Sequence, residues 1–327
     1  MNVLITGGAG YIGSHTAKAM AKAGFKPISL DNMSFGHDWA VKWGPLEKGE
    51  LGDVEFVRRV IKQHKIEAVI HFAANAFVNE SMTNPRKYFQ NNVVNTLNLL
   101  NVMNEENVKN IVFSSTCATY GDPIRVPIDE SHPQNPVNPY GESKLFVEKM
   151  LKWYGGAYEL KWTALRYFNA AGADPDGEIG EDHDPETHLI PLVIQVAMGQ
   201  RPHASVFGTD YPTPDGSAIR DYIHVFDLAD AHVKSLQRLL KGEESTYFNL
   251  GTGTGSTVRQ VIKAVEKSSG KTIKVVEAGR RAGDPPALVA DARKANTVLG
   301  WKPTYPQMET IVEHAWRWHS KHAATHK

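Results

Sequence analysis

The chain has 327 residues, and its 36 Lys and Arg balance 36 Asp and Glu, so the formal net charge is zero. This balance gives no sign of a nucleic-acid partner or an anionic membrane surface, so we expect any phosphate binding to be local. The length predicts one large domain with a smaller annex, or two domains.

The compartment is predicted from cysteine use and from apolar runs. The single cysteine, Cys117, excludes an internal disulfide and fits a reducing compartment. The N-terminus has no charged leader or apolar signal core, and no apolar run approaches about 18 residues. We therefore expect a soluble cytoplasmic protein with no membrane partner.

The start of the chain predicts a βαβ unit. A short apolar strand over Asn2 to Thr6 is followed by the glycine-rich turn Gly7 to Gly13, a helix ending before Gly24, and a second strand over Lys26 to Leu30. The glycines let the backbone approach a pyrophosphate at the helix N-terminus, and Asp31 can accept hydrogen bonds from both ribose hydroxyls. An acid here favours NAD over NADP, because it would repel a 2′-phosphate.

The alternation of helices and strands then continues. We expect helices over Val54 to His64 and Pro85 to Glu106, and strands over Ala68 to Phe72 and Asn110 to Ser114. Repeated βα units predict a Rossmann-type doubly wound parallel sheet, with ligands at the carboxyl ends of its strands. The residues at such ends are Asp53, Phe72, Ala73 and Ser114. Asp53 can meet the adenine or cap the following helix, and the two roles are compatible.

A tyrosine and a lysine share one face of the next helix. This helix is predicted over Tyr140 to Tyr154, and Tyr140 stacks on Lys144 because residues at i and i+4 are neighbours. A phenol with a pKa near 10 must be lowered by about three units, or about 4 kcal/mol, to act as a base at neutral pH. Lys144 and an oxidised nicotinamide ring are two cations that could do so. Thr116, in the preceding polar loop, can donate and accept beside Tyr140.

The alternation breaks down after a strand over Trp162 to Arg166. The chain then becomes richer in Gly, Pro, Asp and His, which marks a substrate-binding region. We predict an α/β protein with a dinucleotide-binding Rossmann domain over residues 1–168 and a smaller C-terminal α/β substrate-binding domain over residues 169–327. Segments near 220–250 are expected to rejoin the first domain, through a helix over Val225 to Leu240 and a strand over Tyr247 to Leu250.

We expect no metal site. The terminal histidines His314, His319, His322 and His326 are spread over one helix without a cysteine or carboxylate cluster, so a solvated face is the simpler interpretation. Cys117 has no evident base partner, and we interpret it as a small loop residue.

Five motifs together resemble UDP-glucose 4-epimerases, which belong to the extended short-chain dehydrogenase/reductase superfamily. They are the segments Thr6 to His15, Asn138 to Lys144, Arg166 to Asn169, Tyr211 to Gly216 and Arg220 to His224. The resemblance covers nearly the whole chain. It implies a homodimeric isomerase that inverts C4 of a UDP-hexose, UDP-glucose or UDP-galactose, with NAD and through a transient 4-keto intermediate.

The resemblance also implies roles for single residues. Tyr140 is the catalytic base, Lys144 holds the nicotinamide ribose and tunes Tyr140, and Thr116 hydrogen-bonds the sugar O4. The residues implied in NAD binding are Gly7, Gly10, Tyr11, Ile12, Gly13, Asp31, Asn32, Asp53, Val54, Phe72, Ala73, Asn91, Ser114, Tyr140, Lys144 and Tyr167. Those implied in UDP-sugar binding are Thr116, Asn169, His188, Leu189, Phe207, Arg220, Arg281, Asp284 and Leu288. Two arginines suit a doubly charged pyrophosphate, because guanidinium binds oxyanions bidentately.

Two departures from the hexose pattern keep the sugar open. Ala76 stands where many hexose epimerases carry a lysine, and His188 where many carry an asparagine. This pattern is similar to the branch that includes UDP-xylose/UDP-arabinose epimerases, so a UDP-pentose is the alternative substrate. Leu288 is either a wall of the sugar pocket near C2 or a core residue.

Three other functions fit the sequence less well. A nucleotide-sugar dehydratase usually carries an Asp-Glu pair directly after the active-site threonine, whereas Cys117 and Ala118 follow here. A UDP-glucuronate decarboxylase shares hydride removal at C4 but has a different second step. A non-catalytic NAD-binding protein would have no reason to keep Thr116, Tyr140 and Lys144 together.

Overall fold

Seven parallel strands form the main sheet of the protein. The computed structural model describes residues 1–281 and 283–325, and within them the strand order is β11-β6-β5-β4-β1-β2-β3. Every neighbouring pair in this sheet is parallel. The strands are β1 (Asn2–Thr6), β2 (Lys26–Asp31), β3 (Leu46–Lys48), β4 (Ala68–His71), β5 (Asn110–Thr116), β6 (Lys161–Tyr167) and β11 (Thr246–Leu250).

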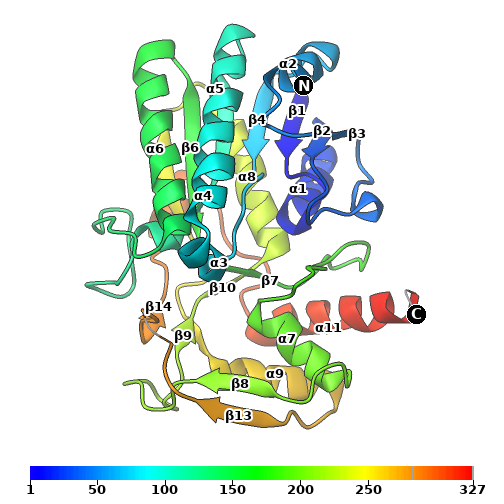
Figure 1. Ribbon diagram of the computed structural model, residues 1–327, viewed down its shortest axis with the longest axis vertical. Helices are drawn as coiled ribbons and strands as arrows, with labels where there is room; N and C mark the ends of the chain where they lie inside the picture. The colour runs from blue at the N-terminus through cyan, green and yellow to red at the C-terminus, as the bar shows by residue number, and fades with distance from the viewer. Residues whose placement is uncertain (282, 326–327) are drawn as a thin grey trace.

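Helices cover both faces of the main sheet (Figure 1). They are α1 (Tyr11–Lys22) and α8 (Val225–Leu240) on one face, and α2 (Val54–Gln63), α5 (Asn95–Glu105) and α6 (Pro139–Tyr158) on the other. Side chains of β1 enter both helical layers, because successive side chains of a strand point to opposite faces of the sheet. Leu4 packs with Val57 of α2, whereas Val3 and Ile5 pack with Ala17 of α1. The predicted Rossmann-type doubly wound sheet is confirmed.

The strand order reverses beside β1. The chain runs from β1 to β2 and β3 in one direction, and to β4, β5 and β6 in the other. The carboxyl ends of β1 and β4 therefore flank a topological switch point, where open α/β sheets bind ligands. This arrangement brings the ends of β1, β2, β4 and β5 to one edge.

The helix predicted over Pro85 to Glu106 is not continuous. The structure has α4 (Pro85–Tyr88), a π-helical segment over Phe89–Val94, and then α5. The wider π turn carries Asn92, whose Oδ1 accepts from the Asn75 backbone N–H at 2.8 Å and whose Nδ2 donates to Ser143 Oγ at 3.0 Å. These contacts explain the break, because they hold the wider turn in place through Asn92. π turns are frequent at functional sites, and Asn75 lies at the switch-point edge.

A smaller α/β lobe lies below the main sheet in Figure 1. The lobe has a hydrophobic core separate from the two cores beside the main sheet, and this core includes Val193, Val206, Val261 and Ile311. Its elements are α7 (Leu189–Ala197), β8 (Ala204–Phe207), α9 (Val258–Ser269), β13 (Val275–Ala278) and α11 (Met308–Thr325). In the part of the chain that the structure describes, no helix has the length and apolar character to cross a membrane.

Shorter elements complete the structure. They are α3 (Val78–Thr83), β7 (Asn169–Ala171) paired with β10 (Tyr222–His224), and β9 (Ile219–Arg220) paired with β12 (Ser256–Thr257) and β14 (Ala287–Leu288). Three others are η1 (Asp38–Ala40), η3 (Cys117–Thr119) and α10 (Arg293–Val298). The chain returns from the smaller lobe to the main sheet through α8 and β11. The domain boundary between residues 168 and 169 stays a prediction.

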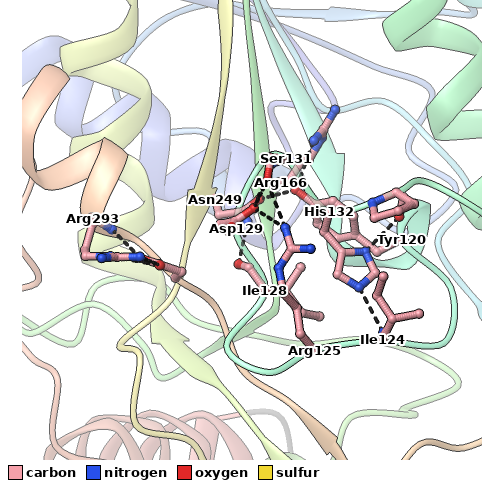
Figure 2. Close-up of polar contacts among 12 residues, drawn as sticks. Tyr120, Ile124, Arg125, Ile128, Asp129, Ser131, His132, Arg166, Asn249 and Arg293 are labelled. Atoms are coloured by element: carbon pink, nitrogen blue, oxygen red, sulfur yellow. Dashed lines mark hydrogen bonds and ion pairs between the residues drawn. The ribbon is translucent and has the colours of Figure 1, made fainter.

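A buried ion pair fastens α6 to β6, on the β5-β6-β11 side of the sheet. Arg166 of β6 and Glu148 of α6 are each only 2% exposed, and Arg166 Nε and Nη2 donate to Glu148 at 2.8 and 2.6 Å. Glu148 also accepts from Ser115 Oγ at 2.6 Å. Arg166 Nη1 donates to Tyr120 Oη at 2.9 Å, and Tyr120 donates to Asn249 of β11 at 2.7 Å. Figure 2 shows Tyr120, Arg166 and Asn249 together.

We predict that Arg166→Met destabilises the protein by about 3 to 5 kcal/mol, because it leaves the Glu148 carboxylate buried without its partner. Urea denaturation monitored by circular dichroism measures this change. The matched control is Arg125→Met, which removes an exposed ion pair with Asp129 seen in Figure 2 and should change the free energy of unfolding by less than about 1 kcal/mol. Equal effects of the two substitutions would refute the structural role of the buried pair.

Candidate active site

The switch point opens into a cavity of about 690 Å³. The predicted site residues that line it are Gly7, Gly10, Tyr11, Ile12, Gly13, Asp31, Asn32, Phe72, Ala73, Asn91, Ser114, Thr116, Tyr140, Lys144, Tyr167, Asn169, His188, Leu189, Arg281, Asp284 and Leu288. Its walls thus come from the main sheet, from α6 and from the smaller lobe. Among the described residues, the predicted site residues outside this lining are Asp53, Val54, Phe207 and Arg220.

The glycine turn fits an anion at the start of α1. Gly7 has a φ of 72°, which favours glycine, and a Cβ on Gly13 would lie 2.1 Å from the Gly7 carbonyl oxygen. The N-cap residue of α1, Gly10, supplies no side-chain hydrogen bond to the helix. The first-turn N–H groups, which lack intrahelical partners, therefore face the cavity where an anion can accept from them. The turn fits the pyrophosphate of a dinucleotide.

Asp31 ends β2 as a buried acid at the same edge. Its Oδ2 accepts from the Ala9 N–H at 3.0 Å and its Oδ1 from the Met33 N–H at 2.9 Å. Burial raises the pKa of Asp31, these two hydrogen bonds oppose the rise, and the charge of nearby Glu50 adds to it. Asn32 donates to Glu50. Two acids at this end of β2 disfavour a 2′-phosphate and suit ribose hydroxyls.

Asp53 has a structural role that the geometry shows directly. It is the N-cap of α2, and its Oδ1 accepts from the Phe56 N–H at 3.0 Å. The cavity is lined by Gly49, Glu50 and Leu51 just before it. Asp53 and Val54 do not line the cavity, so their role in cofactor binding stays a prediction. Capping of α2 by Asp53 is compatible with that role.

Tyr140 and Lys144 are placed by the start of α6. Asn138 caps the helix by accepting from the Gly141 N–H at 2.8 Å, and Pro139 occupies the first turn. Lys144 Nζ donates to the Ser114 carbonyl at 2.8 Å and lies 6.0 Å from the centroid of the Tyr140 ring. The predicted stacking of the two side chains is therefore present.

The electrostatics of this pair differ from the prediction. Burial raises the pKa of Tyr140 to about 12, against a lowering contribution from the Thr116 hydroxyl. Burial lowers the pKa of Lys144 to about 7. In the protein by itself the lowered Tyr140 pKa expected from Lys144 and an oxidised nicotinamide together is not present, because burial disfavours the charged forms of both side chains. A cation from outside the chain is needed to favour the phenolate.

The polar side chains at the ends of β5 and β6, next to Lys144, form hydrogen bonds with one another or with the backbone. Ser114 Oγ and Tyr167 Oη form a hydrogen bond between β5 and β6. Burial raises the pKa of Tyr167, so it is a neutral phenol at neutral pH. Thr116 ends β5, and its hydroxyl accepts from the Ala118 N–H at 3.1 Å. These contacts fix the ends of the strands beside Tyr140.

The two arginines expected at a pyrophosphate flank one loop of the smaller lobe. Arg220 pairs with Asp284 and donates to the Pro285 carbonyl at 3.0 Å, so its guanidinium is already engaged. The guanidinium of Arg281 lies 3.8 Å from the centroid of the Phe207 ring. Arg281 lines the cavity, whereas Arg220 and Phe207 support the residues that do.

Leu288 combines the two roles that the sequence left open. It lines the cavity and also packs against a cluster that contains Tyr120, Ile128, Phe168 and Ala290. A change in its size would therefore alter both the cavity and its support.

Several lining residues were missed by the sequence analysis. They include Phe35, Gly36, Asn75, Glu181, His183 and Tyr222. Asn75 follows the end of β4 closely enough for the strand-end rule to have found it. Glu181 and His183 lie in the segment rich in Gly, Pro, Asp and His, which marked a region but no single residue.

The histidines of α11 differ from the predicted solvated face. His314 is buried, and its Nδ1 lies 2.9 Å from His224 Nε2. His322 hydrogen-bonds Asp182 at 3.0 Å, and His326 lies outside the described residues. Burial raises the pKa of Cys117 to about 12, which makes its thiol unreactive and fits the interpretation as a loop residue.

The sheet topology, the anion site at α1 and the acid that ends β2 together define a dinucleotide-binding protein of the Rossmann class. The chain belongs to the NAD dependent epimerase/dehydratase family, which it matches over residues 3–251.

Similar proteins of known name extend this result. A UDP-glucose 4-epimerase of Halalkalibacterium halodurans is 52% identical over 98% of this chain and 96% of its own length. The crystal structure of a Brucella ovis UDP-glucose 4-epimerase in complex with NAD has a TM-score of 0.94 and 48% identity, over 96% of each chain. That of a Bifidobacterium longum UDP-glucose 4-epimerase in complex with NAD⁺ and UDP has a TM-score of 0.92 and 39% identity, over 99% of each chain.

Proposed function

We propose that this protein is an isomerase that inverts C4 of UDP-glucose and UDP-galactose with NAD, through a transient 4-keto sugar. The observation that carries the proposal is that Thr116, Tyr140 and Lys144 share one cavity with the anion site of α1 and with Arg281. The relatives at about half identity over almost the full chain are named UDP-glucose 4-epimerases, which supports the proposal.

The residues present fit NAD. The free first-turn N–H groups of α1 would hold its pyrophosphate, Asp31 would accept from the adenosine ribose, and Lys144 would contact the nicotinamide ribose. When bound, NAD supplies the hydride acceptor and donor of the redox-neutral cycle.

The chain itself positions the sugar and moves a proton. Tyr140 takes the proton of the C4 hydroxyl and later returns it, while the Thr116 hydroxyl orients O4. Arg281, His188 and the start of α7 hold the uridine diphosphate, and Asn169 is kept in place by donating to the Asp221 carbonyl at 2.9 Å. Firm binding of the diphosphate lets the 4-keto sugar turn over in the cavity, so that both of its faces meet the cofactor in turn.

A dimer and a cytoplasmic location belong to the same proposal. Phe146 and Trp153, seven positions apart on α6, are 42% and 77% exposed, and such apolar side chains on one helix face suit contact with a second copy. Analytical ultracentrifugation would refute this if it gave only the mass of one chain. The single Cys117 fits a reducing compartment, which cell fractionation can test.

The function is tested by incubating the purified protein with UDP-sugars and separating the products by chromatography. We expect UDP-glucose and UDP-galactose to interconvert without added cofactor, because the reaction is redox-neutral and the protein should retain its NAD. Accumulation of a keto sugar or a strict need for NADPH would contradict the proposal. If only UDP-xylose and UDP-arabinose react, Ala76 and His188 identify a pentose enzyme instead.

We predict that Tyr140→Phe abolishes most of the activity while NAD and UDP still bind, because the change removes the transferable proton and little contact area. Initial rates and tight-binding NAD content are the measurements. Tyr154→Phe on the same helix is the control, since its hydroxyl contacts only Asn101 among the described residues, and it should keep near-normal turnover. Near-normal turnover in Tyr140→Phe would rule out Tyr140 as the base.

We predict that Leu288→Cys raises the rate with UDP-N-acetylglucosamine at least tenfold relative to UDP-glucose, equivalent to about 1.4 kcal/mol in the transition state. The wild type should turn over the N-acetylated sugar poorly, because a clash of the acetamide with Leu288 costs about 1 to 3 kcal/mol. Kinetics with both substrates measure the ratio. An equal change for both would assign Leu288 to the core alone.

A further inference from the structure

Four side chains of metal-binding type converge in the segment before α7. They are Glu181, His183, Glu186 and His188, and one ligand atom from each lies within 4.8 Å of the other three. The roles proposed above use only His188 of this group. The spacing Glu-x-His-x-x-Glu-x-His places all four on one short loop beside the cavity.

The separations lie on both sides of those within a tetrahedral metal site. His183 Nδ1 lies 3.1 Å from Glu181 Oε1 and 3.9 Å from Glu186 Oε1. His188 Nδ1 lies 3.8 Å from Glu186 Oε1 and also contacts Glu181 Oε1. Ligand atoms about 2.0 to 2.1 Å from a zinc ion would be about 3.3 to 3.4 Å apart in a tetrahedron. Small shifts would therefore place all four atoms around one ion.

The charge of the cluster favours a bound cation. The side chains of Glu181 and Glu186 are only 2% and 4% exposed, and two buried carboxylates at this distance need positive charge. Within residues 1–281 and 283–325, both acids form ion pairs with histidines only. His183 Nδ1 is buried, and its 3.1 Å approach to Glu181 Oε1 lacks the geometry of a hydrogen bond in the described part of the chain. An unsatisfied buried nitrogen beside two acids indicates a ligand.

Surrounding contacts hold these side chains in orientation. Glu186 Oε1 accepts from the Thr187 and His188 N–H groups at 2.7 and 2.8 Å. The Glu181 carbonyl accepts from Trp318 Nε1 of α11 at 3.0 Å. The Tyr11 ring packs edge-on against His183, with centroids 6.2 Å apart. Such outer contacts are what fix ligands in natural metal sites.

We propose that Glu181, His183, Glu186 and His188 bind one divalent transition-metal ion of the zinc class. Two imidazoles select such ions over magnesium and calcium. Because four protein ligands fill a tetrahedron, the ion has a structural role. It fastens the loop to the start of α7, which carries His188 and Leu189 into the cavity. No metal was predicted from the sequence because only the spread histidines of the terminal helix were considered as ligands. The Glu-x-His-x-x-Glu-x-His spacing was not.

A second acidic group provides a matched control. Asp174, Asp176 and Glu178 also lie close together, but Lys18 Nζ sits among them at 2.7, 2.9 and 2.6 Å. This group already has its cation and lacks histidine. It should bind no transition metal.

The test uses the full-length, tag-free protein with its own bound nucleotide, stripped of metal by a chelator and dialysed. Titration with Co²⁺ should give one ion per chain and the intense visible absorption of tetrahedral cobalt, without the near-ultraviolet band of a thiolate ligand. Zn²⁺ should displace the cobalt and raise the melting temperature. A weak octahedral spectrum, or no stoichiometric binding, would overturn the proposal.

Two variants locate the site. His183→Gln and Glu186→Gln should each lose the tetrahedral absorption and the stabilisation by Zn²⁺, whereas Asp176→Asn should keep both. Circular dichroism and retained nucleotide verify that the variants are folded, and the wild-type titration decides the proposal if one of them is not. Unchanged cobalt binding in both ligand variants would also overturn it.

Discussion

The site depends on the parallel pairing of β1 with its two neighbours. Parallel strands bring their carboxyl ends to one edge, and the reversal of strand order beside β1 leaves that edge open between two directions of the sheet. The glycine turn after β1, Asp31 at the end of β2 and Ala73 after β4 therefore meet around one cavity. Antiparallel pairing of the same strands would have separated them.

The second constraint is the attachment of α6 to this edge. Glu148 binds Arg166 of β6, and Lys144, one turn earlier, donates to the carbonyl of Ser114 in β5. Asn138 and Pro139 fix where the helix starts, so Tyr140 has one possible position relative to the strand ends. A helix held at both its first turn and its middle can orient a reacting group without help from loops.

The sequence predicted what local patterns determine. The βαβ unit follows from a glycine turn between two apolar runs, and Val225–Leu240 was predicted to the residue because its apolar period ends at clear boundaries. The π turn at Phe89–Val94 could not be found, because Asn92 bonds Asn75 and Ser143, which are distant in sequence. The engagement of Arg220 by Asp284 also depends on contact across 64 positions. The ends of strands were predictable, whereas the partners of polar side chains were not.

Burial explains why the pKa of Tyr140 could not be inferred from the spacing of Tyr140 and Lys144. Burial disfavours the charged forms of these two side chains, so it raises the pKa of the phenol and lowers that of the amine. The two groups then favour the neutral pair over the phenolate and ammonium. A cation bound beside Tyr140 would lower the pKa of the phenol, and it would further discourage protonation of Lys144. A ribose hydroxyl that accepts a hydrogen bond from Lys144, or a negative charge nearby, would instead raise the pKa of the amine. The protein by itself therefore contributes a desolvated phenol held at the start of α6, and the charge state of that phenol depends on what else occupies the cavity.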